Sequence, residues 1–236
     1  MNFGSLFSGI GGMDLGLERA GMACAWQVEN DPFCNRILRK HWPDVPRYLD
    51  VRDVAISDLA PVDLICGGVP CQPFSTASAG KRRGTSDDRW LWPEMRRLVQ
   101  GLKPRYVLVE NVRGFDGPGL EQVVSDLEAS DYEVLPPLEV PACAFGYDHW
   151  RPRIWILAYS DNKGEPGRSI HAEVAELPRC NSDTGSMGVE DGIPRRMDRM
   201  KALGNAAHVD IAEWVGRNLV APGEEKPATH VREEGE

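Results

Sequence analysis

Short apolar runs alternate with amphipathic segments along the first 160 residues of the chain. The apolar runs predict strands, and the segments between them carry apolar residues at helical spacing. The predicted strands are 3–7, 23–29, 45–50, 62–66, 105–110 and 154–158, and the predicted helices are 11–21, 31–42, 93–102 and 120–129. This alternation is typical of an α/β fold with a mostly parallel, doubly wound sheet that helices cover on both faces.

The alternation ends near residue 160. Residues 160–199 are rich in Gly, Pro, Asp and Ser and show no strong periodicity beyond a short helical candidate at 172–177. An amphipathic pattern returns at 206–219 and predicts a last helix. The predicted organisation is a catalytic and cofactor-binding domain at 1–160, a very small recognition appendage at 161–200, a helix within 201–220 that packs back on the first domain, and a flexible acidic tail at 221–236.

Composition places the chain among globular proteins. Of the 236 residues, 42% are hydrophobic and 27% are charged, as is usual for a soluble domain. The apolar runs are far shorter than the roughly 20 residues needed to span a bilayer, and the first residues form no leader pattern. We therefore expect a cytoplasmic protein with no membrane contact. The cysteines show no zinc-binding spacing, so no metal is expected.

The charge is uneven along the chain. A net charge of −9 argues against a general nucleic-acid binder. However, basic residues gather at 81–83 with Arg89, and again at 195–201, and a phosphate backbone responds to such local patches. From charge alone, either group is equally well a solvated protein face.

Residues that could take part in catalysis or ligand binding follow the predicted strands, at the edge where such sheets bind ligands. The turn at 6–12, LFSGIGG, opens a helix, and its glycines allow the backbone to approach an anionic ligand. Glu29 ends the second strand, 20 residues after Gly9, where a carboxylate can bind ribose hydroxyls, and Asp50 ends the third. The turn alone could be a tight turn without a ligand, but with the two acids it favours a nucleoside-containing cofactor.

The segment 67–75, GGVPCQPFS, presents Cys71 between two prolines after an apolar strand. Cys71 is either a small apolar filler in a stiff loop or a nucleophile at the end of a strand. Glu110 ends the fifth predicted strand. Burial of a carboxylate there costs free energy unless the group has an ionic or hydrogen-bonding partner or a functional role. Arg151 and Arg153 immediately precede the last strand, so we expect a thiol, a carboxylate and two guanidinium groups on one rim.

The chain resembles the DNA (cytosine-5)-methyltransferases, and the resemblance covers nearly the whole chain. The motifs that carry it stand in the family's order: FSGIGG, VEND, GGVPCQPFS, VENV, RPRIWIL and LGNA. It implies a Rossmann-like fold that binds S-adenosylmethionine, and a compact bacterial or phage enzyme acting on double-stranded DNA. It also implies that Cys71 attacks carbon 6 of a flipped-out cytosine, that Glu110 hydrogen-bonds nitrogen 3, and that Arg153, and less directly Arg151, hold the oxygen on carbon 2.

The resemblance extends to cofactor and DNA contacts, which carry over motif by motif. The implied S-adenosylmethionine contacts are Phe7, Gly9, Ile10, Gly12, Glu29, Asn30, Asp50, Val51, Gly68, Pro70, Leu91, Asn205 and Ala206. The loop 75–89 resembles the family's mobile catalytic loop. The implied DNA contacts there and just before it are Gln72, Ser75, Lys81, Arg82, Arg83 and Arg89. Two interpretations stay open for a second basic group, which either contacts DNA or is only a solvated face of the protein. Its residues are Arg195, Arg196, Arg199 and Lys201.

The chain departs from the family pattern at three places. Asp148–His149 stand where Pro-Gln is usual, so that His149 either replaces the glutamine as a brace or is incidental. Ala207–His208 stand where Val-Pro is common. The recognition region is at most 160–199, much shorter than usual, which predicts a short or relaxed target site or dependence on a partner.

Two alternatives remain beside the DNA enzyme. One is a tRNA cytosine-5 methyltransferase, although the Cys-Phe-Thr tripeptide of that branch is absent. The other is a catalytically degenerate DNA-binding or regulatory relative, since a fold alone does not establish an activity. For the DNA enzyme we expect a monomer, with a companion restriction endonuclease or a recognition subunit as further partners.

Overall fold

The computed structural model describes residues 1–70, 90–115, 117–160 and 206–219. Its centre is an eight-stranded sheet with the order β3-β2-β1-β4-β5-β8-β6, in which β7 also pairs with β8. The strands are β1 Asn2–Leu6, β2 Ala23–Val28, β3 Arg47–Tyr48, β4 Leu64–Gly68, β5 Tyr106–Val112, β6 Tyr132–Val134, β7 Leu138–Val140 and β8 Arg153–Ser160.

Five α-helices and three short 3-10 turns accompany the sheet within the described residues. The helices are α1 Gly12–Arg19, α2 Pro32–His41, α3 Trp92–Leu102, α4 Pro118–Glu128 and α7 Val209–Leu219. The turns are η1 Ile56–Asp58, η3 Arg113–Phe115 and η4 Ala142–Phe145. The predicted helices at 11–21, 31–42, 93–102, 120–129 and 206–219 are present, whereas the candidate at 172–177 lies outside the described residues. Asp31 caps α2 as its position suggests, because its Oδ1 accepts the backbone N–H of Phe33 at 2.8 Å.

The sheet is parallel from β3 to β5 and antiparallel beyond β5. The pairs among β1 to β5 are parallel, whereas β8 pairs antiparallel with β5, β6 and β7. The predicted α/β fold is confirmed, but β6 and β7 were not predicted. The predicted strand 45–50 shrinks to Arg47–Tyr48, because Pro46 has no backbone donor and Asp50 accepts the N–H groups of Arg52 and Asp53 in a turn.

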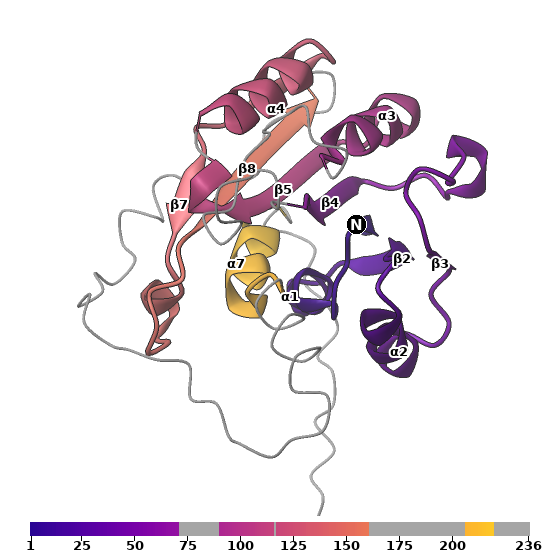
Figure 1. Cartoon of the computed structure of the whole chain (residues 1–236), viewed down its shortest axis with the longest axis horizontal. Coiled ribbons are helices and arrows are strands. Elements are labelled where there is room, and N and C mark those ends of the chain that lie inside the picture. Colours follow the sequence, from indigo (N-terminus) through magenta and orange to yellow (C-terminus); the bar gives the residue numbers. More distant parts are fainter. Residues whose placement is uncertain (71–89, 116, 161–205, 220–236) are drawn as a thin grey trace, which may run out of the picture.

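Strand β5 shows why the sheet has helices on both faces. Tyr106 and Leu108 belong to one core cluster, with Leu17 of α1 and Ile211 of α7. The alternate residues Val107 and Val109 belong to the other, with the buried side chains of α3 and α4. Because successive strand residues point to opposite faces, one apolar strand supplies both cores. In Figure 1, α3 and α4 accordingly lie on one side of the sheet and α1 and α7 on the other.

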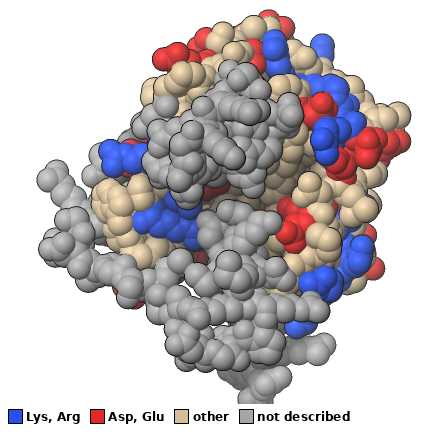
Figure 2. Space-filling view, in the orientation of Figure 1, with Lys and Arg blue, Asp and Glu red and all other residues tan. Residues whose placement is uncertain are grey.

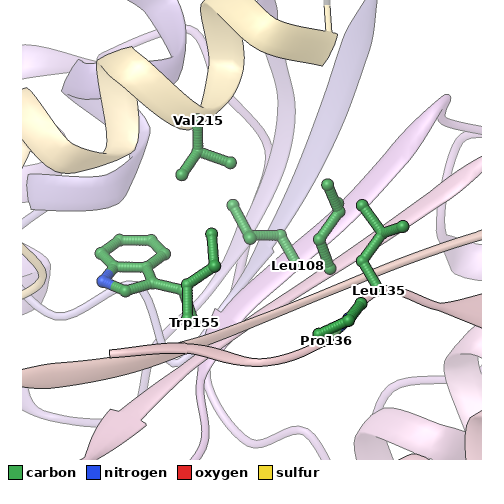
Figure 3. A pocket seen from close by; sticks show the side chains of 7 residues that line it. Leu108, Leu135, Pro136, Trp155 and Val215 are labelled. Carbon is green, nitrogen blue, oxygen red and sulfur yellow. The ribbon is translucent and has the colours of Figure 1, made fainter. Parts of the chain in front are cut away.

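Helix α7 packs closely on α1 through small residues. A β-carbon on Gly16 would lie 2.3 Å from the carbonyl oxygen of Val209, and one on Gly216 would lie 2.7 Å from the β-carbon of Ala20. The helix also covers the sheet: Figure 3 shows Val215 above Trp155 and Leu108. A small apolar pocket remains there, lined by Leu108, Leu135, Pro136, Leu138, Trp155, Leu157 and Val215.

The helices within the described ranges are also too short or too polar to cross a bilayer.

Candidate active site

The carboxyl ends of β1, β4 and β5 meet at one edge of the sheet. The register pairs Leu6 with Gly67 and Gly68 with Glu110. The glycine-rich turn after β1, the loop that leads from β4 to Cys71, and Glu110 on β5 therefore share this edge. This is where an open α/β sheet binds its ligand.

The turn after β1 has an unusual backbone that Glu29 holds in place. Phe7 has φ +55°, a conformation that bulky residues rarely adopt and that costs about 1–3 kcal/mol, and Gly9 and Gly11 also have positive φ. The N–H of Gly9 donates to Glu29 Oε2 at 2.7 Å, and the N–H of Asp31 donates to Glu29 Oε1 at 2.7 Å. Glu29 thus orders the turn, a role that its spacing from Gly9 did not reveal.

The start of α1 also touches the segment 206–209. A β-carbon on Gly12 would lie 2.2 Å from the carbonyl oxygen of Ala207, so this position has room only for glycine. A groove of about 500 Å³ opens beside this contact. Its lining residues are Ile10, Gly11, Gly12, Leu15, Glu18, Ile37, His41, Trp42, Tyr147, Arg151, Ala206, Ala207, His208 and Val209.

Asp50, one of the implied S-adenosylmethionine contacts, is paired with a neighbouring arginine. Arg52 donates to both carboxylate oxygens of Asp50, at 2.9 and 2.6 Å. These hydrogen bonds lower the pKa of Asp50 to about 2. Val51 is buried and Leu91 packs against the same core cluster, so two of the implied cofactor contacts are apolar side chains of one core. Asn30 is exposed.

Glu110 and Arg153 form a buried ion pair. Arg153 Nε lies 3.1 Å from Glu110 Oε1, and the two side chains are only 15% and 8% exposed. Burial raises the pKa of Glu110, whereas Arg153 and then Arg151 oppose that rise. A β-carbon on Gly68 would lie 3.1 Å from Glu110 Oε2, so the backbone of β4 approaches the carboxylate closely. The predicted convergence of Glu110 with Arg153 is therefore found.

Arg151 belongs to the same site but faces the C-terminal segment. Its Nη2 donates to the carbonyl oxygen of Ala206 at 2.5 Å, and its backbone has φ +31°. Burial, followed by the nearby charge of Arg153, lowers the pKa of Arg151. The strained backbone and the half-buried cation indicate that the surrounding structure holds this loop in a defined conformation.

Asn111 is a further residue of the site, for which the sequence predicted no role. Its Nδ2 donates to the carbonyl oxygen of Val69 at 3.1 Å, and its Oδ1 accepts the N–H of Val112 at 2.9 Å. The buried amide thus ties the end of β5 to the loop that contains the half-buried Pro70 and leads to Cys71. Its place beside Glu110 in VENV was the signal available in the sequence.

Several predicted residues lie outside the described ranges. These are Cys71, Gln72, Ser75, Lys81, Arg82, Arg83, Arg89 and Asn205, together with Arg195, Arg196, Arg199 and Lys201. Figure 2 shows the described basic side chains on one face as separate groups with acidic ones among them. No three metal-ligating side chains come together within the part of the chain that the structure describes.

Comparison with known proteins decides the family. The sequence model of the C-5 cytosine-specific DNA methylases matches residues 1–187. The chain belongs to this family. The family predicted from the order of the motifs is thereby confirmed, with the buried Glu110–Arg153 pair at the expected sheet edge.

Relatives within the family include type II methyltransferases. The chain is 36% identical over 174 residues to M.AquIA of Picosynechococcus sp., a match that covers 65% of this chain and 69% of the relative. It is 36% identical over 165 residues to M.NgoMIV of Neisseria gonorrhoeae, covering 67% and 52%. Against M.HgiCII of Herpetosiphon aurantiacus the identity is 34%, and only 39% of that relative is covered. The chain therefore spans only part of the length of these methylases.

Solved structures agree with this family assignment. A protein described as a DNA modification methyltransferase encoded within an E. coli prophage is 28% identical, with a TM-score of 0.61 over 82% of this chain and 56% of that one. Spodoptera frugiperda DNMT2 is 20% identical, with a TM-score of 0.59 over 82% and 57%. The second likeness shows the fold alone.

Proposed function

We propose that this chain is a DNA (cytosine-5)-methyltransferase that transfers a methyl group from S-adenosylmethionine to a cytosine flipped out of double-stranded DNA. The observation that carries the proposal is the buried Glu110–Arg153 pair beside the loop that leads to Cys71. The membership of the chain in the C-5 cytosine-specific DNA methylases names the base and the carbon.

Glu110 lies in a buried environment that favours its protonated form. Its burial raises its pKa, so the carboxyl group keeps a proton more readily than an exposed glutamate does. In the proposed reaction Glu110 hydrogen-bonds nitrogen 3 of cytosine and stabilises the charge that develops on the ring. Arg153 orients the carboxyl group and hydrogen-bonds the oxygen on carbon 2, and Arg151 supports the same loop.

Cys71 is the proposed nucleophile. Carbon 5 of cytosine is a poor nucleophile, and addition of a thiolate to carbon 6 makes it an enamine carbon that can accept a methyl group. Loss of the proton on carbon 5 and expulsion of the Cys71 thiolate then restore the aromatic ring. Because carbon 6 is inaccessible in a stacked duplex, the base must leave the helix first.

The residues around the glycine-rich turn fit S-adenosylmethionine, which supplies the methyl group when bound. The turn presents backbone rather than side chains at Gly9, where a β-carbon would meet no described atom within 4 Å, and a β-carbon on Gly68 would crowd Glu110 Oε2 at 3.1 Å. Glu29 keeps further acceptor capacity on its two oxygens for ribose hydroxyls. The proposed contacts of Phe7, Ile10, Gly12, Asn30, Asp50, Val51, Pro70, Leu91, Asn205 and Ala206 follow from the family motifs.

DNA binding is assigned to two segments. Gln72, Ser75, Lys81, Arg82, Arg83 and Arg89 would contact phosphates beside the flipped base, and such contacts position the duplex without reading its sequence. Residues 161–200 would supply a reduced recognition segment, so we propose a short or relaxed target site. Bisulfite sequencing of DNA methylated in vitro tests this, and a long, strictly read site would contradict it.

The setting that we propose is the cytoplasm of a bacterium or of a phage-infected host. There the chain would act in restriction-modification as a monomer, beside a companion endonuclease or a recognition subunit. Sedimentation of the purified chain with and without duplex DNA tests the proposed monomer, and a stable dimer would contradict it.

Methyl transfer from labelled S-adenosylmethionine tests the activity itself. We expect label in duplex DNA and not in tRNA, at the carbon 5 position of cytosine, and none with Cys71→Ala. Cys24→Ala, at a half-buried cysteine on β2, is the matched control and should remain active. Label in tRNA alone would favour the RNA-directed alternative, and label in neither substrate would favour the degenerate one.

A further inference from the structure

Two of the positions at which this chain departs from the family pattern lie close together in the structure. His149, in the loop before β8, and His208, just before α7, have ring centroids 5.9 Å apart. Tyr147 contacts both: its ring lies 4.1 Å from that of His208 in an edge-on arrangement and 5.8 Å from that of His149. We call Tyr147, His149 and His208 the aromatic clasp.

The aromatic clasp is anchored to the C-terminal helix and to α1. The Tyr147 hydroxyl donates to Asp210 Oδ2 in the first turn of α7. Asp210 Oδ1 in turn lies 3.3 Å from Arg19 Nη1 at the end of α1. The loop before β8 is thus bound directly to α7 and, through Asp210, to α1.

The segment 206–210 lies between the glycine-rich turn and the arginine loop, which we define as residues 147–153. On one side the carbonyl oxygen of Ala207 packs on Gly12, with no space for a β-carbon. On the other side the carbonyl oxygen of Ala206 accepts from Arg151, and His208 makes an edge-on ring contact with Tyr147. Within the same loop, Arg153 reaches Glu110. The segment therefore connects the predicted cofactor turn with the groups that hold the base.

His208 is suited to be an uncharged packing partner. Its Nδ1 is buried and has no hydrogen-bond partner among the residues that the structure describes. Burial first, and then the charges of Arg151, His149 and Arg153, lower its pKa to about 4, against an opposing effect of Asp210. At neutral pH the ring is therefore neutral, and the contact with Tyr147 is one between two aromatic rings.

We propose that the aromatic clasp is a positioning device that holds the arginine loop against Glu110, in place of the Pro-Gln and Val-Pro pairs usual in the family. This inference rests on the proposed function. The three residues act through Arg151 and Arg153, which would contact the base. Because displacement of a reacting group by about 1 Å can cost about 100-fold in rate, a loosened loop should slow methyl transfer without abolishing it.

The test compares His208→Ala, Tyr147→Ala and their double variant with the full-length protein. Each single variant should lower kcat about 10- to 100-fold, and KM for S-adenosylmethionine should change far less. The double variant should be no slower than the slower single variant, because the two rings act as one unit. His208→Phe keeps an aromatic ring and should restore most of kcat. The matched control is His41→Ala, which changes an exposed histidine at the end of α2.

Hydrogen exchange gives a second readout that does not depend on activity. In His208→Ala, the amides of the arginine loop should exchange faster, whereas those of β4 and β5 should keep their protection and show that the fold is intact. Unchanged kcat and unchanged exchange, or additive losses in the double variant, would overturn the inference. If the wild-type protein transfers no methyl group, the proposed function fails, and the exchange experiment still decides whether the clasp holds the loop.

Discussion

Replacing Arg153 by methionine would leave a buried carboxyl group without its ionic partner. Methionine keeps much of the length of the side chain but has no guanidinium to face Glu110, whose side chain is 8% exposed. Removing one member of a buried ion pair destabilises a protein by about 3–5 kcal/mol, because the remaining charge has lost its compensation. We therefore expect Arg153→Met to lower the free energy of unfolding by about 3–5 kcal/mol near pH 8.

The loss should depend on pH in a defined direction. Burial already raises the folded-state pKa of Glu110, and removal of Arg153 would raise it further. A carboxyl group with a raised folded-state pKa contributes stability that is fully present below its unfolded pKa and is lost as the pH rises through the folded pKa. The difference between wild type and Arg153→Met should therefore be small near pH 4.5, where Glu110 can take up a proton, and should grow toward pH 8.

Urea unfolding at several pH values, followed by circular dichroism, measures the effect. The double variant Glu110→Gln with Arg153→Met carries no charge at the pair and should recover most of the lost stability, but it should not transfer methyl groups. Arg113→Met is the matched control, because its pair with Glu139 is exposed and should contribute about 0–1 kcal/mol. A loss that is independent of pH, or a double variant less stable than Arg153→Met, would refute the reasoning.

Three further predictions concern stability. Asp14 is fully buried and burial raises its pKa to about 6, so its contribution should fall by roughly 3 kcal/mol as the pH rises from 3.8 to 6, and Asp14→Asn should remove this dependence in urea titrations. Gly16→Ala would place a β-carbon 2.3 Å from the carbonyl oxygen of Val209, so thermal unfolding should show a large loss of stability from the α1–α7 contact. The pKa of His208 is lowered, so the wild type should lose stability relative to His208→Phe as the pH falls from about 6.5 toward 4, and parallel unfolding curves would contradict this.

The parallel part of the fold could be predicted because its strands are apolar on both faces. β4 and β5 read as continuous apolar runs, since helices cover both of their faces. β6 and β7 have three residues each and are separated by Pro136 and Pro137, so no local pattern marks them as strands. Their pairing with β8 is a long-range contact, and local periodicity in the sequence cannot predict such a contact.

The candidate site was predictable where a residue ends a strand. Glu110 ends the predicted apolar strand 105–110 and lies near the end of β5, Arg153 begins β8, and the antiparallel pairing of β5 with β8 brings these ends together. Contacts set by tertiary packing were not predictable in the same way. The hydrogen bond of Asn111 to Val69 and the ring contact of Tyr147 with His208 join segments whose spacing in the sequence carries no signal.

Trapping on 5-fluorocytosine DNA tests the central claim most directly. Fluorine on carbon 5 cannot leave as the proton does, so an enzyme that adds its cysteine to carbon 6 and transfers the methyl group stays bound to the DNA. With S-adenosylmethionine and duplex DNA, we predict a covalent protein–DNA adduct through Cys71 that is absent in Cys71→Ala. No adduct from the wild-type protein, or an adduct that persists in Cys71→Ala, would contradict the account.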